Sequence, residues 1–65
     1  MVSINDSKVT GNTFIAVVMA AFDLDDQRQV TISHDLNFNG FGSVQVNGEW
    51  FDWFKDGETT NFMEA

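Results

Sequence analysis

The sequence predicts a single α+β domain over residues 1–65, in which one helix packs on a small antiparallel sheet of three to four strands. Three observations support this fold class. One apolar run has helical spacing, a later segment alternates as a half-buried strand does, and an Asn-Gly pair separates two apolar runs. A chain of 65 residues without cysteine has room for one small core and no disulfide framework.

The helix is expected over residues 13–24. Phe14, Val18 and Phe22 stand at i, i+4 and i+8, which is typical of a helix buried on most sides. A strand is the alternative because several residues are β-branched, but the length and the alanines favour a helix. Thr10 or Asn12 is expected to cap its start, since either side chain can accept a hydrogen bond from a first-turn amide.

The strands are expected at both ends of the chain and after the helix. Residues 2–4 suit a short edge strand, residues 29–34 alternate apolar and polar, and residues 59–63 suit a short final strand after a turn at 55–57. The clearest signal is Asn47-Gly48 between residues 43–46 and 49–54, because both turn positions of a type I′ hairpin need positive φ. A helical turn over 49–56 is the rival interpretation.

The register of this hairpin predicts two unlike faces of the sheet. The core face beneath the helix is expected to hold Val44, Val46, Phe51 and Trp53. The reverse face is expected to hold Phe41, Trp50 and Phe54 around Asp52. Large exposed rings beside carboxylates are typical of a protein-binding surface. Coverage of the rings by the same chain or by a second copy is the alternative.

The charge of the chain limits its partners. Three basic residues stand against ten acidic ones, for a formal net charge of −7. Direct binding to nucleic acid and to anionic membranes is disfavoured, whereas a basic protein surface is favoured. Solubility alone is the alternative explanation of the charge. No apolar run reaches the roughly 20 residues that cross a bilayer, and Asp6 beside Lys8 is unlike a basic leader, so a cytoplasmic location is expected.

The candidate partner-binding residues are two acidic clusters and two rings: Asp23, Asp25, Asp26, Glu49, Trp50, Asp52, Phe54, Asp56 and Glu58. Alternate strand positions stand about 6.6 to 7 Å apart, which is comparable in scale to the spacing of backbone charges in a nucleic acid. Carboxylates at such positions could occupy a protein groove that binds phosphates. A solvated acidic rim is the alternative. The first cluster is expected in a loop, because carboxylates at a helix C-terminus oppose the macrodipole.

No catalytic activity, metal or cofactor is expected. Asp35, Asn37, Asn39 and Gly40 match the first half of a calcium-binding EF-hand loop, but Val46 replaces the glutamate at its twelfth position. Calcium binding there is a further alternative. Residues 33–35 form a Ser-His-Asp triad in residue type only, because neighbours on a strand point to opposite faces.

In size, acidity, lack of cysteine and helix-plus-hairpin pattern, the chain resembles the small phage-encoded anti-CRISPR proteins that imitate DNA. The resemblance covers the whole chain without a diagnostic motif, and it transfers no functional residue. It implies a non-catalytic inhibitor in the cytoplasm of a bacterial host cell, present as a monomer or homodimer. The implied target is a CRISPR surveillance complex whose DNA-binding channel is blocked. The alternative function is a structural or assembly module that oligomerises through its aromatic sheet face.

Overall fold

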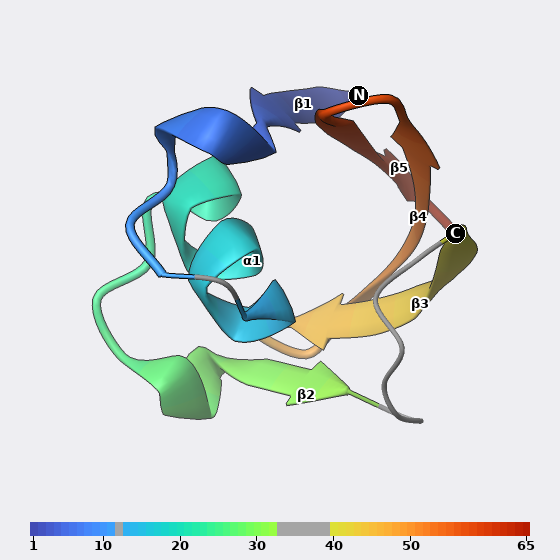
Figure 1. Ribbon diagram of the computed structural model, residues 1–65. Coiled ribbons are helices and arrows are strands. Elements are labelled where there is room, and N and C mark those ends of the chain that lie inside the picture. The colour runs from blue at the N-terminus through green and yellow to red at the C-terminus, as the bar shows by residue number, and fades with distance from the viewer. Residues whose placement is uncertain (12, 33–39) are drawn as a thin grey trace.

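A computed structural model describes residues 1–11, 13–32 and 40–65 (Figure 1). Its elements are β1 (Val2–Asn5), η1 (Asp6–Lys8), α1 (Phe14–Phe22), η2 (Gln27–Gln29), β2 (Val30–Ile32), β3 (Phe41–Val46), β4 (Glu49–Asp56) and β5 (Thr59–Glu64). The α+β class is confirmed. The predicted sheet of three to four strands is wrong, because five antiparallel strands join in the order β1-β5-β4-β3-β2. None of the helices in the described ranges is long and apolar enough to span a bilayer.

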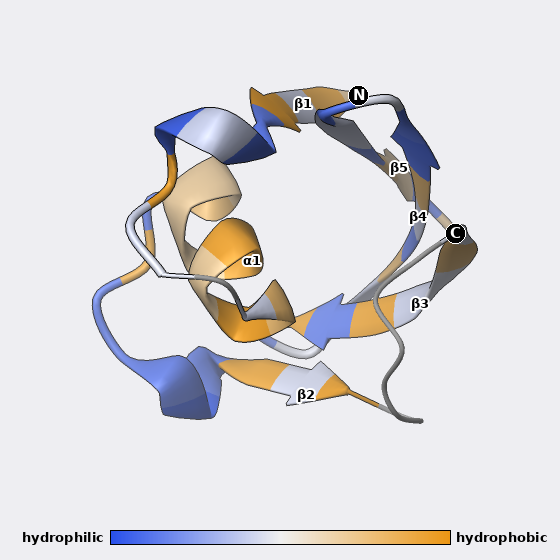
Figure 2. Cartoon of the chain, viewed as in Figure 1, coloured by the Kyte–Doolittle hydropathy of each residue, from blue (hydrophilic) through white to orange (hydrophobic). Residues whose placement is uncertain are grey.

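The sheet curls around a core that the single α-helix closes. In Figure 1, α1 lies at the open side of the curled sheet, and it contacts both edge strands, β1 and β2. Figure 2 shows that α1 is apolar along its length, whereas apolar and polar residues alternate along the strands. The buried apolar residues come from the helix and from four strands: Val17, Val18, Val30, Val44, Val46, Trp53 and Phe62.

Both ends of the helix differ from the expectation. Thr13 is the N-cap, and its Oγ1 accepts a hydrogen bond from the Ala16 amide at 3.1 Å. The predicted cap at Thr10 is therefore wrong, and Asn12 lies outside the described residues. The helix ends at Phe22 instead of residue 24, because Asp23 adopts a left-handed conformation with φ 56°. The loop interpretation of the first acidic cluster is thereby confirmed.

The Asn-Gly hairpin is confirmed with the predicted register. Val46 pairs with Glu49, and the pairing continues without interruption to Phe41 and Phe54. Asn47 and Gly48 have φ of 50° and 85°, as a type I′ turn requires. The rival helical turn over 49–56 is wrong, because these residues form β4.

The remaining strands agree with the prediction in position but not in length. Of the strand predicted over 29–34, only Val30–Ile32 is strand among the described residues, because Gln29 belongs to η2 and residues 33 and 34 lie outside them. The turn expected at 55–57 falls at Gly57 and Glu58 instead, where Gly57 takes φ 63°. The edge strand and the final strand are confirmed, each slightly longer than predicted.

Aromatic rings join the helix to the sheet. Phe14 packs against Trp53 with ring centroids 4.7 Å apart, and Phe22 contacts the rings of Phe51 and Phe62 at 4.9 and 5.1 Å. Val44 and Val46 are buried on the same face. The predicted core face is therefore confirmed, because its members lie on the side of β3 and β4 that meets α1.

Gly42 provides space for the buried indole. Gly42 is paired with Trp53 across β3 and β4, and a Cβ at Gly42 would lie 2.9 Å from Trp53 Nε1. Real Cβ atoms do not approach another atom so closely. Trp53 is only 8% exposed, so its ring can move away only by disturbing the core.

Asp6 joins the N-terminal segment to the turn between β4 and β5. The Asp6 amide donates to the Glu58 carbonyl at 2.7 Å, and the Asp6 carboxylate accepts from the Thr60 hydroxyl at 2.7 Å and forms an ion pair with Lys55. Thr60 is fully buried, and Asp6 and Lys55 are largely covered. Burial lowers the pKa of the Lys55 ammonium, whereas the adjacent carboxylate favours its charged form.

The substitution Gly42→Ala should lower the free energy of unfolding by about 1 to 3 kcal/mol, because the added methyl group overpacks the site against the indole. Chemical denaturation of the two proteins measures this difference. Ser43→Ala is the matched control, since Ser43 is the next residue of β3 and points to the other face. Equal stability of Gly42→Ala and the native protein would contradict the packing described above.

The substitution Asp6→Ala should destabilise the fold by about 1 to 3 kcal/mol, because it leaves the buried Thr60 hydroxyl and the covered Lys55 ammonium without this partner. Asp6→Asn keeps an acceptor for the hydroxyl and removes only the charge, so its loss should be smaller. Thermal unfolding of the three proteins measures both effects. A larger loss for Asp6→Asn than for Asp6→Ala would contradict this order.

Candidate protein-binding site

The face of the sheet turned away from α1 carries most of the exposed large apolar side chains. Phe51 and Trp53 contact the helix, so the alternate residues of β4 point to the opposite side, which we call the outer face. Four large apolar side chains of this face are well exposed: Phe41 at 83%, Trp50 at 44%, Met63 at 40% and Phe54 at 37%. The predicted exposure of the rings on the reverse face is confirmed.

Strand pairing places one carboxylate among these side chains. Asp52 has Trp50 and Phe54 two residues away along β4, and it pairs with Ser43 of β3 and Met63 of β5. The Ser43 hydroxyl donates to Asp52 Oδ1 at 3.4 Å. We call this arrangement the outer patch: Phe41, Trp50, Asp52, Phe54 and Met63.

The outer patch contains a shallow depression beside Asp52. The Lys55 amide donates to the Gly40 carbonyl at 2.8 Å, which makes the next pair along, Phe41 and Phe54, a pair without mutual backbone hydrogen bonds. Side chains of such pairs approach each other closely. The residues lining the depression are Phe41, Gly42, Ser43, Asp52, Trp53 and Phe54. The outer face is therefore hollowed beside Asp52 at the end of the hairpin where Phe41 and Phe54 pair.

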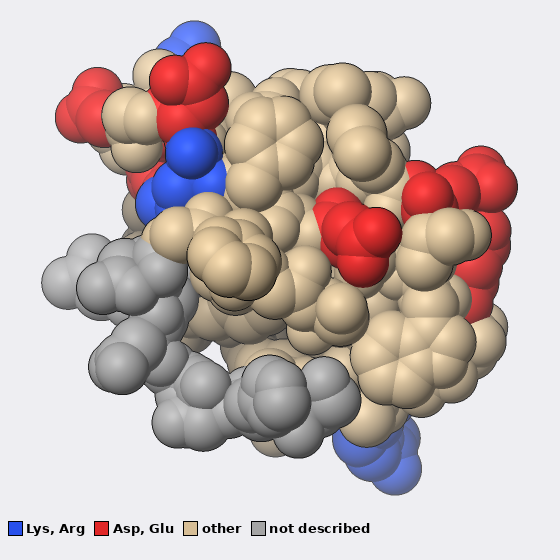
Figure 3. Space-filling model, turned by 90° about the vertical axis from the view of Figure 1, so that its right-hand side faces the viewer, with Lys and Arg blue, Asp and Glu red and all other residues tan. Residues whose placement is uncertain are grey.

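The other carboxylates of the outer face lie toward its margin. Asp56 ends β4 on the outer face, and Glu58 follows in the turn to β5. Asp52 and Asp56 are four residues apart, about 13 Å along a strand, with Phe54 between them. Figure 3 shows this side of the molecule, with one carboxylate group amid the uncharged surface and others near its margins. Rings and carboxylates therefore alternate along β4, and the carboxylates do not follow the phosphate-like spacing of successive alternate positions.

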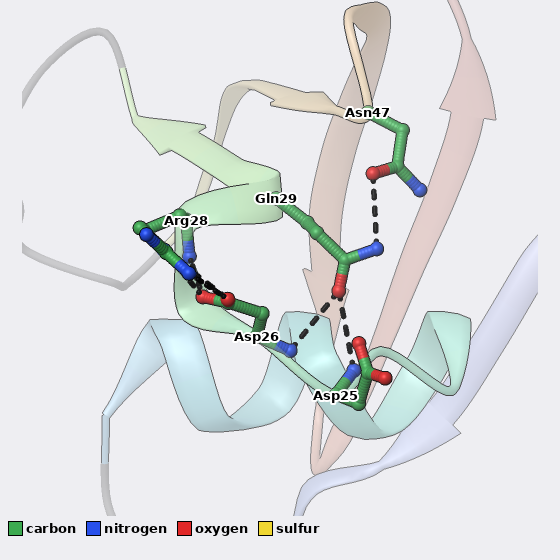
Figure 4. Close-up of polar contacts among 5 residues, drawn as sticks. All are labelled: Asp25, Asp26, Arg28, Gln29 and Asn47. Atoms are coloured by element: carbon green, nitrogen blue, oxygen red, sulfur yellow. Dashed lines mark hydrogen bonds and ion pairs between the residues drawn. The ribbon is translucent and has the colours of Figure 1, made fainter.

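The first acidic cluster lies in a different part of the fold. Asp23 caps the end of α1, and Asp25 and Asp26 lie in the connection to η2. Figure 4 shows how Gln29 holds this connection against the hairpin turn: its Oε1 accepts from the amides of residues 25 and 26, and its Nε2 donates to Asn47 Oδ1 at 3.1 Å. Glu49 follows this turn, and its side chain points to the face opposite Trp50.

The nine candidate residues therefore fall into two groups. Trp50, Asp52, Phe54 and Asp56 share the outer face, with Glu58 at its margin. The other group, Asp23, Asp25, Asp26 and Glu49, gathers around the helix C-terminus and the Asn47-Gly48 turn. Only the first group combines carboxylates with exposed rings.

Arg28 and Lys55 form ion pairs with carboxylates in the described part of the chain. Arg28 binds the Asp26 carboxylate through Nε and Nη2, the latter at 2.7 Å, and Lys55 pairs with Asp6. Lys8 lies in the last turn of η1. Among the described residues, no ion pair involves Asp52. The Asp26 carboxylate is already engaged by a cation, so it is less suited to a partner than the carboxylate of Asp52.

The prediction missed Met63, Asp6 and Lys55. The face that Met63 occupies depends on the exact position of the preceding turn, and the prediction placed that turn at 55–57. The Asp6–Lys55 contact joins residues 49 positions apart, and neither residue lies in a motif. A strand pairing between residues 2–5 and 59–62 would have been needed to find it.

The described ranges contain no group of three or more His, Asp or Glu side chains that could hold a metal ion. The calcium-like stretch 35–39 and residues 33 and 34 of the apparent triad lie outside these ranges. No protein-family model, curated protein or solved structure matches the chain.

The Arg28 guanidinium lowers the pKa of the Asp26 carboxyl group below its ordinary value through a side-chain hydrogen bond. The stability from this pair is therefore present above the ordinary aspartate pKa and is lost as the pH falls through the lowered value. Arg28→Gln should return the Asp26 pKa toward its ordinary value in an NMR titration of the carboxyl carbons. Lys8→Gln, which removes the same charge elsewhere, should leave this pKa unchanged; an equal rise in both variants would contradict the pairing.

Proposed function

We propose that this protein is a non-catalytic inhibitor that binds a basic, nucleic-acid-binding surface of another protein through its outer face. The single observation that carries the proposal is the outer patch, where exposed rings surround the carboxylate of Asp52. Aromatic side chains supply much of the apolar burial in protein interfaces, and a carboxylate among them favours a cationic counterpart. Direct contact with nucleic acid is disfavoured, because the same face would meet phosphates with like charge.

The net charge of −7 supports a basic partner over a second copy of the chain. Two copies would repel one another at long range, whereas a lysine- and arginine-rich surface would attract the chain and speed encounter. In a symmetric dimer centred on the outer patch, the two Asp52 carboxylates would also face each other. An assembly module would therefore have to overcome its own charge.

The resemblance to DNA-imitating anti-CRISPR proteins indicates which kind of protein the partner is. A bacterial defence complex, such as a CRISPR surveillance complex, carries a positively charged channel for nucleic acid. Imitation on the outer face would be by overall charge and by ring contacts, since Phe54 separates Asp52 from Asp56 and the strand lacks a carboxylate at each alternate position. Binding there would exclude the nucleic acid by occupying its site.

The triple variant Asp52→Asn, Asp56→Asn, Glu58→Gln should lose binding to its partner, because it removes the carboxylates of the outer face and its margin. The measurement has two steps: capture of a complex from bacterial lysate on the immobilised protein, then binding of labelled duplex DNA to that complex with and without the native protein. Native protein should abolish DNA binding by the complex, and capture should weaken steeply with salt.

The matched control is the triple variant Asp23→Asn, Asp25→Asn, Glu49→Gln, which changes the net charge by the same amount in the other acidic group. It should retain capture. Equal loss in both variants would show that overall charge, not the outer face, determines binding. Captured complexes that still bind DNA in the presence of the native protein would refute inhibition, and salt-independent self-association through the rings would favour the assembly module.

A further inference from the structure

We propose that the outer patch is a binding site for one arginine side chain of the partner. In this arrangement the guanidinium pairs with the Asp52 carboxylate, with the rings of Trp50 and Phe54 on either side of it. The inference rests on the proposed function and deepens it, because it names the chemical group that the outer face recognises. It follows from the position of a single carboxylate among exposed rings, and not from the acidity of the chain.

The Asp52 carboxylate has no cationic partner among the described residues, and we expect a bound protein to supply one. Its described neighbours on the outer face are uncharged, and the hydrogen bond that it accepts from the Ser43 hydroxyl is long at 3.4 Å. Arg28 and Lys55 are committed to other carboxylates, and Lys8 lies in η1. When a partner covers the surrounding rings, the Asp52 carboxylate loses water, and a carboxylate buried without a counterion is strongly destabilising.

The rings stand where they can contact a cation bound to this carboxylate. Residues two apart on a strand are about 6.6 to 7 Å apart, so Trp50 and Phe54 flank Asp52 on either side at that spacing. A cation held at the carboxylate therefore lies near both rings, and the face of an aromatic ring attracts a cation within roughly 6 Å of its centre. The depression between Phe41, Phe54 and Asp52 leaves room on one side for a flat group.

These contacts favour arginine over lysine. A guanidinium is planar, donates two parallel hydrogen bonds to one carboxylate and stacks on aromatic faces, whereas an ammonium is a compact and more strongly hydrated charge. The exposed rings on either side of Asp52 increase this difference, because the less hydrated cation loses less on entering an apolar surface. A general acidic surface would distinguish the two cations much less.

The experiment uses the isotope-labelled full chain and two glycine-serine peptides of equal length, which carry arginines or lysines at the same positions. Titration of each peptide is followed by the indole N–H resonance of exposed Trp50. The arginine peptide should shift the Trp50 resonance and bind about tenfold more tightly than the lysine peptide, in line with the stronger bidentate and stacking contacts. Equal affinity of the two peptides would overturn the proposal.

Asp52→Asn should weaken binding of the arginine peptide by about tenfold, the scale of one charge-assisted hydrogen-bonded pair. Asp23→Asn is the control, because it removes the same charge at the end of α1, where asparagine also tolerates the left-handed conformation. It should change the affinity by less than about twofold. Equal weakening by both variants would show a diffuse charge effect and overturn the site. Amide spectra establish that each variant keeps the fold.

The outcomes separate this inference from the proposed function. If the arginine peptide leaves Trp50 unshifted while the native protein still captures a complex and blocks its DNA binding, the arginine site is wrong and the inhibitor proposal stands. If the peptide binds at Asp52 but no captured complex loses DNA binding, the inhibitor proposal fails and the arginine site stands. Shifts of the Trp50 resonance on concentration of the protein alone would identify a second copy as the occupant and overturn an arginine from a partner protein.

Discussion

The fold depends on the contact between one short helix and one face of the sheet. Helix α1 has nine residues and is the only α-helix in the described parts of the chain. It covers the concave side of the curled sheet through Phe14 and Phe22, which meet rings of β4 and β5. Each strand presents alternate residues to the two faces, so burial of one face leaves the other turned outward. The outer patch is a direct consequence of this constraint.

The same constraint explains why large rings occur on both faces of β4. On the concave side, Trp53 fits over Gly42, and its burial contributes to a core that a short chain can hardly build from smaller side chains. On the outer face, Trp50 and Phe54 have no layer above them among the described residues and stay partly exposed. Exposed rings do not help a single molecule to fold. Burial of these rings would contribute favourable free energy only in a contact with another molecule.

The carboxylates differ in whether a cation of the same chain pairs with them. The carboxylates of Asp6 and Asp26 bind cations of the same chain and stabilise connections at either end of the fold. Within residues 1–11, 13–32 and 40–65, the carboxylate of Asp52 has no such role, since its neighbours there on the outer face are uncharged. The acidic residues are thus unequal, and a property of the whole chain such as net charge describes only its long-range electrostatic field.

The local parts of the fold could be predicted because they depend on neighbouring residues. Asn47-Gly48 determines the turn by its backbone preference, the turn determines the register of β3 and β4, and the register determines that Val44 and Trp53 share one face while Trp50 and Asp52 share the other. The helix was predictable from the spacing of Phe14, Val18 and Phe22. Its ends were not, because several capping residues compete near the start, and Asp23 ends the helix through a left-handed conformation that glycine or asparagine would signal more clearly.

The features that form between distant segments could be known only from the tertiary structure. The pairing of β1 with β5 and the contact of Asp6 with Lys55 join the two ends of the chain, and Met63 reaches the outer patch only through the pairing of β5 with β4. The sequence by itself determined the composition of the two faces of the hairpin, because side-chain alternation is a local property of a strand. Only the tertiary structure decided which face is covered and which carboxylates are already neutralised, because these depend on where the helix and the cations come to lie in space.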